Sequence, residues 1–204
     1  RLRSVLTVLG IVIAVASTIT VVSVVQGFTR YVSDFLQGLG TNAMWIWPER
    51  PPGEEGKTLG RIELDADDVA AIRDCSALRL VSPLVRREGV KLATGREEIS
   101  VPLEGVSSEY HAIRNFPVEL GRPFAVVDIE RSHAVCVLGR EVVRKLKEDS
   151  GIVGRTLLVG GRRFRVIGVL EEKGSFLGSS QDDVVLVPYT TAVKMFPNAR
   201  RSMA

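Results

Sequence analysis

The stretch from Ser4 to Val25 contains no charged side chain, and it constrains this chain more than any other feature. The hydrocarbon core of a bilayer is about 30 Å thick, and an α-helix needs roughly 20 apolar residues, at about 1.5 Å each, to cross it. The rest of the 204-residue chain is polar and charged. The sequence therefore predicts a membrane helix over residues 1–27, with a folded body outside the bilayer.

Two other interpretations of this stretch fit its residues less well. In a cleaved signal peptide, Arg1 and Arg3 would form the positive region and Ala14–Val15–Ala16 the cleavage site. The apolar run continues well past Ala16, however, so cleavage there would leave an apolar N-terminus without a burial site. In a buried core helix, one polar face would be expected, and this stretch has none. A membrane helix is therefore favoured.

The flanking charges predict the orientation of the membrane helix. Arg1 and Arg3 precede the apolar run, and Arg30 is the only basic residue close behind it. Long domains cross the membrane largely regardless of their own charge, so a small excess of arginine at the N-terminus is enough to orient the helix. We expect a cytoplasmic membrane location, with the N-terminus in the cytoplasm and the body outside.

A stem helix is predicted to continue from the membrane helix over residues 28–40. Apolar side chains recur there at spacings of three and four residues, which places them on one helical face. They are Phe28, Tyr31, Val32, Phe35, Leu36 and Leu39. Gly38 and Gly40 are typical stop signals for a helix. This apolar stripe needs a packing partner, and the chain's own body and another stem fit the pattern equally well.

Residues 41–204 are predicted to form an α+β body. Strands are expected at 80–85, 89–93, 99–106, 134–138 and 184–187, and the Gly160–Gly161 turn predicts a hairpin over 155–170. Helices are expected at 66–75, 108–114 and 140–146, and from an N-cap at Thr190 or Thr191 to Phe196. Pro102 indicates an edge or irregular position. A polar loop is expected from Glu171 to Asp183, with Phe176 and Leu177 at its middle.

Nothing in the sequence predicts a catalytic, cofactor or metal site, so we do not expect an enzyme. His111 and His133 lack metal-ligand spacing, and the carboxylate pairs Asp182–Asp183 and Glu171–Glu172 are interpreted as solvated charge. The 27 Lys and Arg nearly balance the 24 Asp and Glu, and the two signs are interspersed, which argues against nucleic-acid binding. Cys75 and Cys136 fit no redox motif; two separately buried thiols are favoured over a disulfide.

Four sequence blocks follow one another along the chain. Arg3 is followed by an L-T-V-L-G-I run, Leu6 to Ile11. An L-G-R-P-F block, Leu120 to Phe124, comes next, and then a G-x-x-F-x-V-I-G-V run, Gly161 to Val169. A D-D-V-V-L-V-P run, Asp182 to Pro188, completes the set. In this order the blocks resemble the permeases of MacB-type and FtsX-like ABC transporters, and the first block is similar to the start of their first membrane helix.

The resemblance implies a MacB-like extracytoplasmic core domain at 41–204, inserted between the first two membrane helices. It implies two lobes, a porter-like lobe from the ends of the insert and a β-rich lobe from about 80–168. It further implies that the chain is a fragment, because the family continues through more of this domain and three further membrane helices. The full-length protein is therefore expected to be multi-pass.

The resemblance also implies a mechanical role in efflux or extraction of substrate. ATP and magnesium would bind a partner ABC ATPase, and the further partners would be a second permease copy, a periplasmic adaptor protein and membrane lipid. The stripe from Phe28 to Leu39 would be the coupling surface, and Phe176 and Leu177 a contact for the adaptor or substrate. Two alternatives remain: an FtsX-like regulator of cell-wall hydrolases, and an unrelated single-span binding module.

Overall fold

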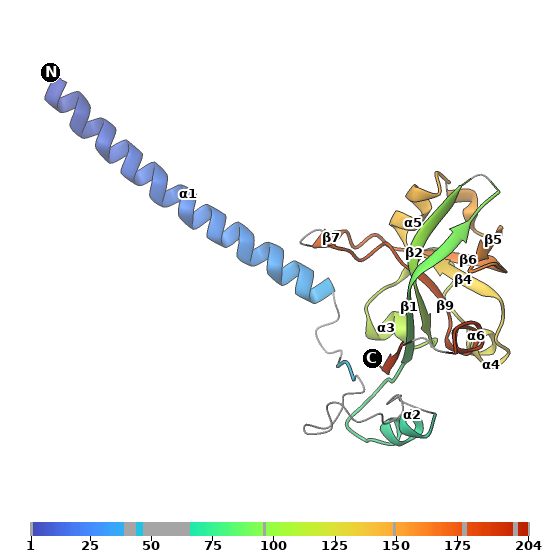
Figure 1. Ribbon diagram of the computed structural model, residues 1–204. Coiled ribbons are helices and arrows are strands. Elements are labelled where there is room, and N and C mark those ends of the chain that lie inside the picture. Colours follow the sequence, from blue (N-terminus) through green and yellow to red (C-terminus); the bar gives the residue numbers. More distant parts are fainter. Residues whose placement is uncertain are drawn as a thin grey trace, which may run out of the picture. The chain divides into compact units, whose positions relative to one another are not determined.

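The computed structural model describes residues 2–38, 44–46, 66–95, 97–148, 150–176, 179–197 and 200–203. The chain divides into two compact units, residues 1–41 and 42–204, and each is described by itself. The first unit is a single helix and the second is a body of strands and short helices (Figure 1). We refer to the second unit as the body.

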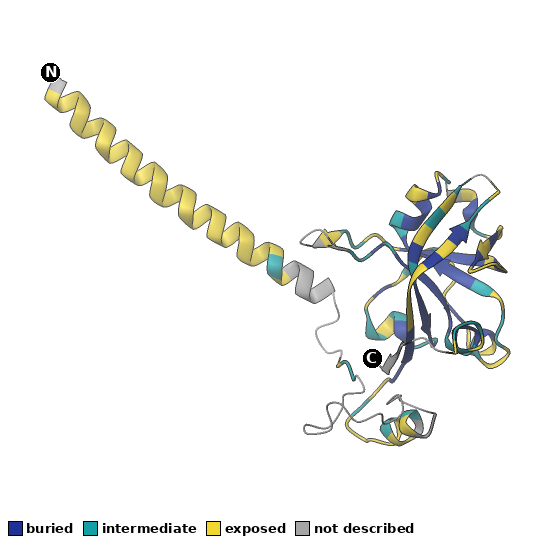
Figure 2. Ribbon diagram, in the orientation of Figure 1, coloured by how far each residue is buried: buried dark blue, intermediate teal, exposed yellow. Residues whose placement is uncertain are grey.

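The first unit consists of one uninterrupted helix, α1, from Leu2 to Gly38. The expected continuation of the apolar helix into the stem is therefore present in the backbone. The stretch from Arg3 to Ser33 is long and apolar enough to cross a membrane, and its side chains are not buried within the molecule (Figure 2). Thr7, Thr18 and Thr20 each donate a hydroxyl hydrogen bond to the carbonyl four residues earlier, at 2.8–2.9 Å, which pairs these polar groups inside the helix.

The body is built on one sheet of eight strands. The strands are β1 (Pro83–Ala93), β2 (Glu98–Val106), β3 (Val118–Gly121), β4 (Val135–Leu138), β5 (Thr156–Val159), β6 (Arg162–Leu170), β9 (Val185–Pro188) and β10 (Arg200–Met203). A separate hairpin joins β7 (Ser175–Phe176) and β8 (Ser179–Ser180). The helices are α2 (Ala66–Arg73), α3 (Tyr110–Ile113), α4 (Val126–Glu130), α5 (Arg140–Lys145) and α6 (Tyr189–Met195), with a 3-10 turn at Ser150–Ile152.

The sheet closes on itself because β5 pairs with two strands at once. Its order is β10-β1-β2-β9-β4-β6-β3, and β5 pairs antiparallel with both β1 and β6. Strands β1, β2, β9, β4, β6 and β5 therefore form a ring, with β10 and β3 attached outside it. Closure of the ring removes the free backbone edges that an open sheet of the same strands would expose.

One hydrophobic core fills the ring, because alternate side chains of every strand point inward. Leu92 on β1 and Val159 on β5 are fully buried and pair across the two strands. Phe164 on β6, the strand that forms a hairpin with β5, adds an aromatic side chain to the same core. Val142 on α5 and Ala192 on α6 belong to the same core. A second core lies against other sheet residues and contains side chains from α3 and the loops around it, including Tyr110, Phe116 and Phe124.

The two expected lobes do not form separate units in the described residues. Strand β9, which comes from the C-terminal part of the chain, lies between β2 and β4. It pairs parallel with β2 at Leu103–Val106 and antiparallel with β4 at Val137–Leu138. Because β9 completes the ring, the segment 80–168 shares one core with it, and residues 42–204 cluster as one compact unit.

The local predictions hold for most elements, with specific exceptions. The two strands expected at 80–85 and 89–93 are one strand, β1, because Gly89 at φ +69° accommodates a register shift between Arg87 and Val90. This irregularity lies opposite Pro102, which confirms the irregular position predicted for that proline. The strands β3 and β10 and the helix α4 were not anticipated, and each is only four or five residues long.

The threonines expected to cap the last helix do not do so. The residue before α6 is Pro188, and it makes no side-chain capping bond. Thr190 instead donates its hydroxyl to the carbonyl of Ile129, and Thr191 donates to the carbonyl of His133. Tertiary contacts with the segment around α4 therefore outweigh the local capping preference.

The close approach of α6 to β2 generates a stability prediction. A Cβ added at Gly105 would lie 2.2 Å from Ala192 Cβ, so Gly105→Ala must displace the helix or the strand. We expect the variant to lose about 1–3 kcal/mol of unfolding free energy in chemical denaturation. Gly151→Ala is the matched control, because a Cβ there meets nothing within 4 Å, and an unchanged stability of Gly105→Ala would contradict the packing described.

Candidate functional site

The predicted stem stripe lies on a regular helix as far as the structure describes it. Phe28 and Tyr31 are 63% and 49% exposed, and Val32 is half-buried. Phe35 and Leu36 continue the same face in the helical backbone of α1. The side chains of Phe35 and Leu36, and all of Leu39, lie outside the described residues. The role of this face stays a prediction.

The predicted loop at 171–183 contains a short hairpin. Ser175 pairs with Ser180 and Phe176 with Ser179, so β7 and β8 are antiparallel. Figure 1 shows this hairpin projecting from the body. The structure places Phe176 in the backbone of β7, but its side chain and the whole of Leu177 lie outside the described residues. The contact role of these two residues is therefore still a prediction.

The base of the hairpin is held by a buried carboxylate, which corrects the interpretation of Asp182 as solvated charge. Asp182 is 2% exposed and accepts hydrogen bonds from the backbone N–H groups of Lys173, at 2.9 Å, and Gly174, at 2.7 Å. Backbone N–H groups withdrawn from water need partners, and here one carboxylate pairs two that are partly buried. Asp183 and Glu172 do make surface pairs, with Lys145 and Arg144 respectively.

Lys173 joins the same base to the segment after α3. Its Nζ donates to the carbonyl of Arg114 at 2.7 Å and lies 4.7 Å from the centre of the Phe116 ring. Burial and the nearby charge of Arg114 lower the pKa of Lys173 to about 8, although Asp182 and Glu171 act in the opposite direction. The hairpin therefore leaves the body from a base with several polar contacts.

A second polar cluster fixes α4. Asp128, buried at 2% exposure, accepts from Arg122 Nη1 at 2.6 Å and from the N–H of Ala125 at 2.9 Å, and its other oxygen lies 3.1 Å from His133 Nδ1. The Arg122 guanidinium holds the pKa of the Asp128 carboxyl well below its usual range. This cluster ties the L-G-R-P-F block to α4, and its hydrogen bonds are structural.

The remaining sequence candidates have ordinary environments. Cys136 is buried and Cys75 is exposed, and both are free thiols. The expectation of two buried thiols is therefore wrong for Cys75. His111 is half-buried, with Nδ1 3.0 Å from the carbonyl of Phe116. Among the residues that the structure describes, no group of three or more His, Cys, Asp or Glu could hold a metal ion.

Comparison with known proteins identifies the family. The family model for the MacB-like periplasmic core domain matches residues 4–203. The chain belongs to this family. A macrolide export ATP-binding/permease protein MacB from Rhodopirellula baltica is 36% identical over 197 residues, and one from Wolinella succinogenes is 35% identical over 191 residues. Each alignment covers 93% of this chain but only 28% and 29% of those relatives, so the chain spans less than a third of their length.

Solved MacB-like structures share the fold. The periplasmic region of MacB from Actinobacillus actinomycetemcomitans has a TM-score of 0.64 and 24% identity, over 82% of this chain and 75% of that one. The extracellular domain of the transporter YknZ from Gram-positive bacteria has a TM-score of 0.64 and 21% identity, over 79% and 83%. The apolar helix α1 and the match to a periplasmic domain family together fit a membrane protein with an extracytoplasmic domain.

The blocks that carried the resemblance have structural roles in this MacB-like domain. The G-x-x-F-x-V-I-G-V run forms β6, which pairs with three other strands, β3, β4 and β5. Gly168 in that run admits no side chain, because a Cβ would lie 2.8 Å from the carbonyl oxygen of Arg122 and from Val118. Gly121 in the L-G-R-P-F block adopts φ +86°, which favours glycine. The blocks therefore identify the fold.

Removal of the Asp182 carboxylate is expected to loosen the base of the hairpin. Asp182→Ala leaves two partly buried N–H groups without their protein partner, which should lower the unfolding free energy by about 1–2 kcal/mol. Hydrogen exchange should accelerate at the amides of Lys173 and Gly174. Glu172→Ala, which removes an exposed partner of Arg144, should cost less than about 1 kcal/mol. Equal protection of the two amides in both variants would refute this role.

The lowered pKa of Lys173 leads us to expect that the unfolding free energy depends on pH. Below its folded pKa of about 8 the ammonium is charged in both states, and the folded state bears the burial penalty. Between that value and the ordinary value of 10.5, the unfolded state binds more protons, so the contribution of Lys173 to stability rises with pH. Relative to Lys173→Met, the wild-type chain should gain on the order of 1 kcal/mol between about pH 7 and about pH 10. Denaturation at several pH values measures this, and a constant difference between the two chains would contradict it.

Proposed function

We propose that this chain is the first membrane helix and the extracytoplasmic domain of an ABC transporter permease. In this role the permease couples ATP hydrolysis in the cytoplasm to movements outside the membrane that export or extract a substrate. The observation that carries the proposal is the match to the MacB-like periplasmic core domain over residues 4–203, together with the uninterrupted helix α1. The names of the relatives, which describe macrolide export, support efflux over regulation of a cell-wall hydrolase.

The helix α1 is suited to transmit motion because it is continuous from the apolar run to Gly38. A membrane needs roughly 20 residues, so nearly half of this 37-residue helix would extend beyond the lipid. Motion imposed at the cytoplasmic end of a continuous helix reaches its other end without a hinge. In the proposed orientation the N-terminus is in the cytoplasm, the helix crosses the cytoplasmic membrane, and the stem stripe from Phe28 to Leu39 is the coupling surface.

The proposed partners follow from the division of labour in this mechanism. ATP and magnesium bind an ABC ATPase, either a separate subunit or another domain of the full-length protein, and this segment performs no catalysis. A second permease copy supplies the other stem, and lipid surrounds the apolar run. The β7–β8 hairpin, with Phe176 and Leu177, is the proposed contact for a periplasmic adaptor or substrate, supported by its projection from the body and its hydrogen-bonded base.

The coupling role can be tested with one charge placed on the stem stripe. In the full-length permease with its ATPase, Phe35→Asp is expected to leave the body folded and ATP hydrolysis intact, while substrate transport falls at least about tenfold. The physical reason is that a carboxylate on the apolar face opposes its packing against a partner. Transport and ATP turnover are measured on the same reconstituted sample.

Gln37→Asp provides the matched control for this experiment. Gln37 follows Phe35 by two residues, which places it roughly 200° around the helix on the opposite face. The control introduces the same charge at nearly the same depth, so it should preserve both transport and coupling. Normal coupled transport in Phe35→Asp, or an equal loss in both variants, would rule out the stripe as the coupling surface.

A further inference from the structure

The outer face of the β5–β6 hairpin carries positive charge that the body does not neutralise. Thr156 pairs with Arg165, and Leu158 pairs with Arg163, across the two antiparallel strands. All four are exposed, whereas the residues that alternate with them point into the ring. We call these four residues, Thr156, Leu158, Arg163 and Arg165, the hairpin surface.

Both arginines of the hairpin surface lack a carboxylate partner among the described residues. Neither takes part in an ion pair or a side-chain hydrogen bond there. Two nearby cations differ in this respect. Arg155 contacts Glu148 at 2.7 Å, and Lys91 contacts Glu98 at 2.7 Å. The hairpin therefore carries three arginines without an ion pair among the described residues, because Arg162, next to Arg163, lacks one as well.

The register of the surrounding strands explains why these arginines stay unpaired. Val135 on β4 lies beside Arg165, and Ala93 on β1 lies beside Leu158. Neither neighbour is acidic, and the sequence contains no Asp or Glu from Gly151 to Leu170. Elsewhere the two charge signs are interspersed, so this hairpin has an unusually uniform positive charge.

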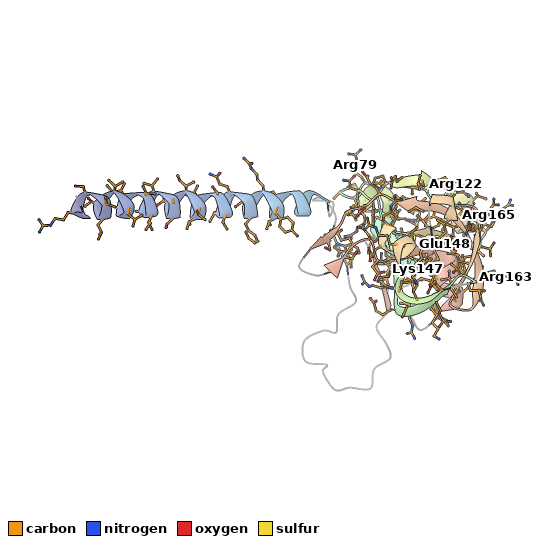
Figure 3. The ribbon with its side chains drawn as sticks, turned by 90° about the horizontal axis from the view of Figure 1, so that it is seen from above. Arg79, Arg122, Lys147, Glu148, Arg163 and Arg165 are labelled. Atoms are coloured by element: carbon orange, nitrogen blue, oxygen red, sulfur yellow. The ribbon has the colours of Figure 1, made fainter. Side chains whose placement is uncertain are left out.

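We propose that the hairpin surface binds an acidic segment of a partner protein, which goes beyond the transport role proposed above and does not depend on it. Arg163 and Arg165 lie on one strand face, about 7 Å apart along the strand, on the outside of the body (Figure 3). A guanidinium pairs with a carboxylate through two parallel hydrogen bonds. Two carboxylates on alternate residues of an extended segment match this spacing, and Leu158, 44% exposed, offers an apolar contact beside Arg163.

Two other binding modes fit the hairpin less well. Addition of a partner strand needs a long free backbone edge, but β5 is paired on both sides at Leu158 and Val159, and β6 is paired on both sides from Arg165, so only two- and three-residue stretches of edge remain. Docking on a lipid surface needs several apolar side chains that enter the interface, and the hairpin surface has only Leu158. Recognition of carboxylates by side chains is therefore the mode that the geometry favours.

The test uses the full chain in detergent and a fluorescein-labelled peptide of alternating glutamate and threonine with a central leucine. Fluorescence anisotropy measures binding at low ionic strength, where charge pairing is strongest. The double variant Arg163→Glu with Arg165→Glu is expected to weaken peptide binding at least about tenfold. The double variant Arg140→Glu with Arg144→Glu changes the net charge equally but replaces arginines that already pair with carboxylates, and it should weaken binding less than about twofold.

Three results would overturn the proposal. The first is no binding of the peptide to the wild-type chain. The second is an equal loss in both double variants, which would mean that only the net charge matters. The third is preferential binding to phosphatidylglycerol vesicles that depends on Arg163 and Arg165, which would assign the surface to lipid. Thermal denaturation of each variant establishes that the chain is folded before binding is compared.

Discussion

The pairing of β5 with both β1 and β6 is the constraint on which the body depends. This short strand closes the ring and brings distant segments into one core, including β9 from the C-terminal part of the chain. Closure also determines which side chains of the β5–β6 hairpin face outward, because inward positions are filled by Leu157, Val159 and Phe164. The outward-facing side chains of this MacB-like body are therefore held by a single closed sheet.

Two buried carboxylates fix surface segments to this scaffold, and one of these segments is the hairpin proposed as a contact for a partner. Asp182 pairs the backbone at the base of the β7–β8 hairpin, and Asp128 pairs Arg122 and the start of α4. In both cases the charge is buried with hydrogen-bond donors around it, which is the condition for a stable buried carboxylate. The two clusters therefore position a projecting hairpin and a surface helix.

Local sequence patterns predicted the elements that depend on neighbours in the chain. The long helix α1, the hairpin turning at Gly160–Gly161, and α5 all appear close to their predicted bounds. The predictions failed where distant residues decide the outcome. Thr190 and Thr191 bond to carbonyls near α4 instead of capping α6, and Asp182 is buried because the loop folds back on itself.

The sequence by itself determined the apolar helix and most strands, because these follow from the periodicity and composition of contiguous residues. The family was visible in the resemblance of its ordered sequence blocks. The candidate stem face was likewise visible in the spacing of Phe28, Tyr31 and Val32. Only the tertiary structure decided the closure of the ring, the burial of Asp182 and Asp128, and the isolation of Arg163 and Arg165 from carboxylates. Closure of the ring depends on pairing between segments far apart in the chain. The two carboxylates are buried because their loops fold back on nearby hydrogen-bond donors, and no spacing of residue types records that folding.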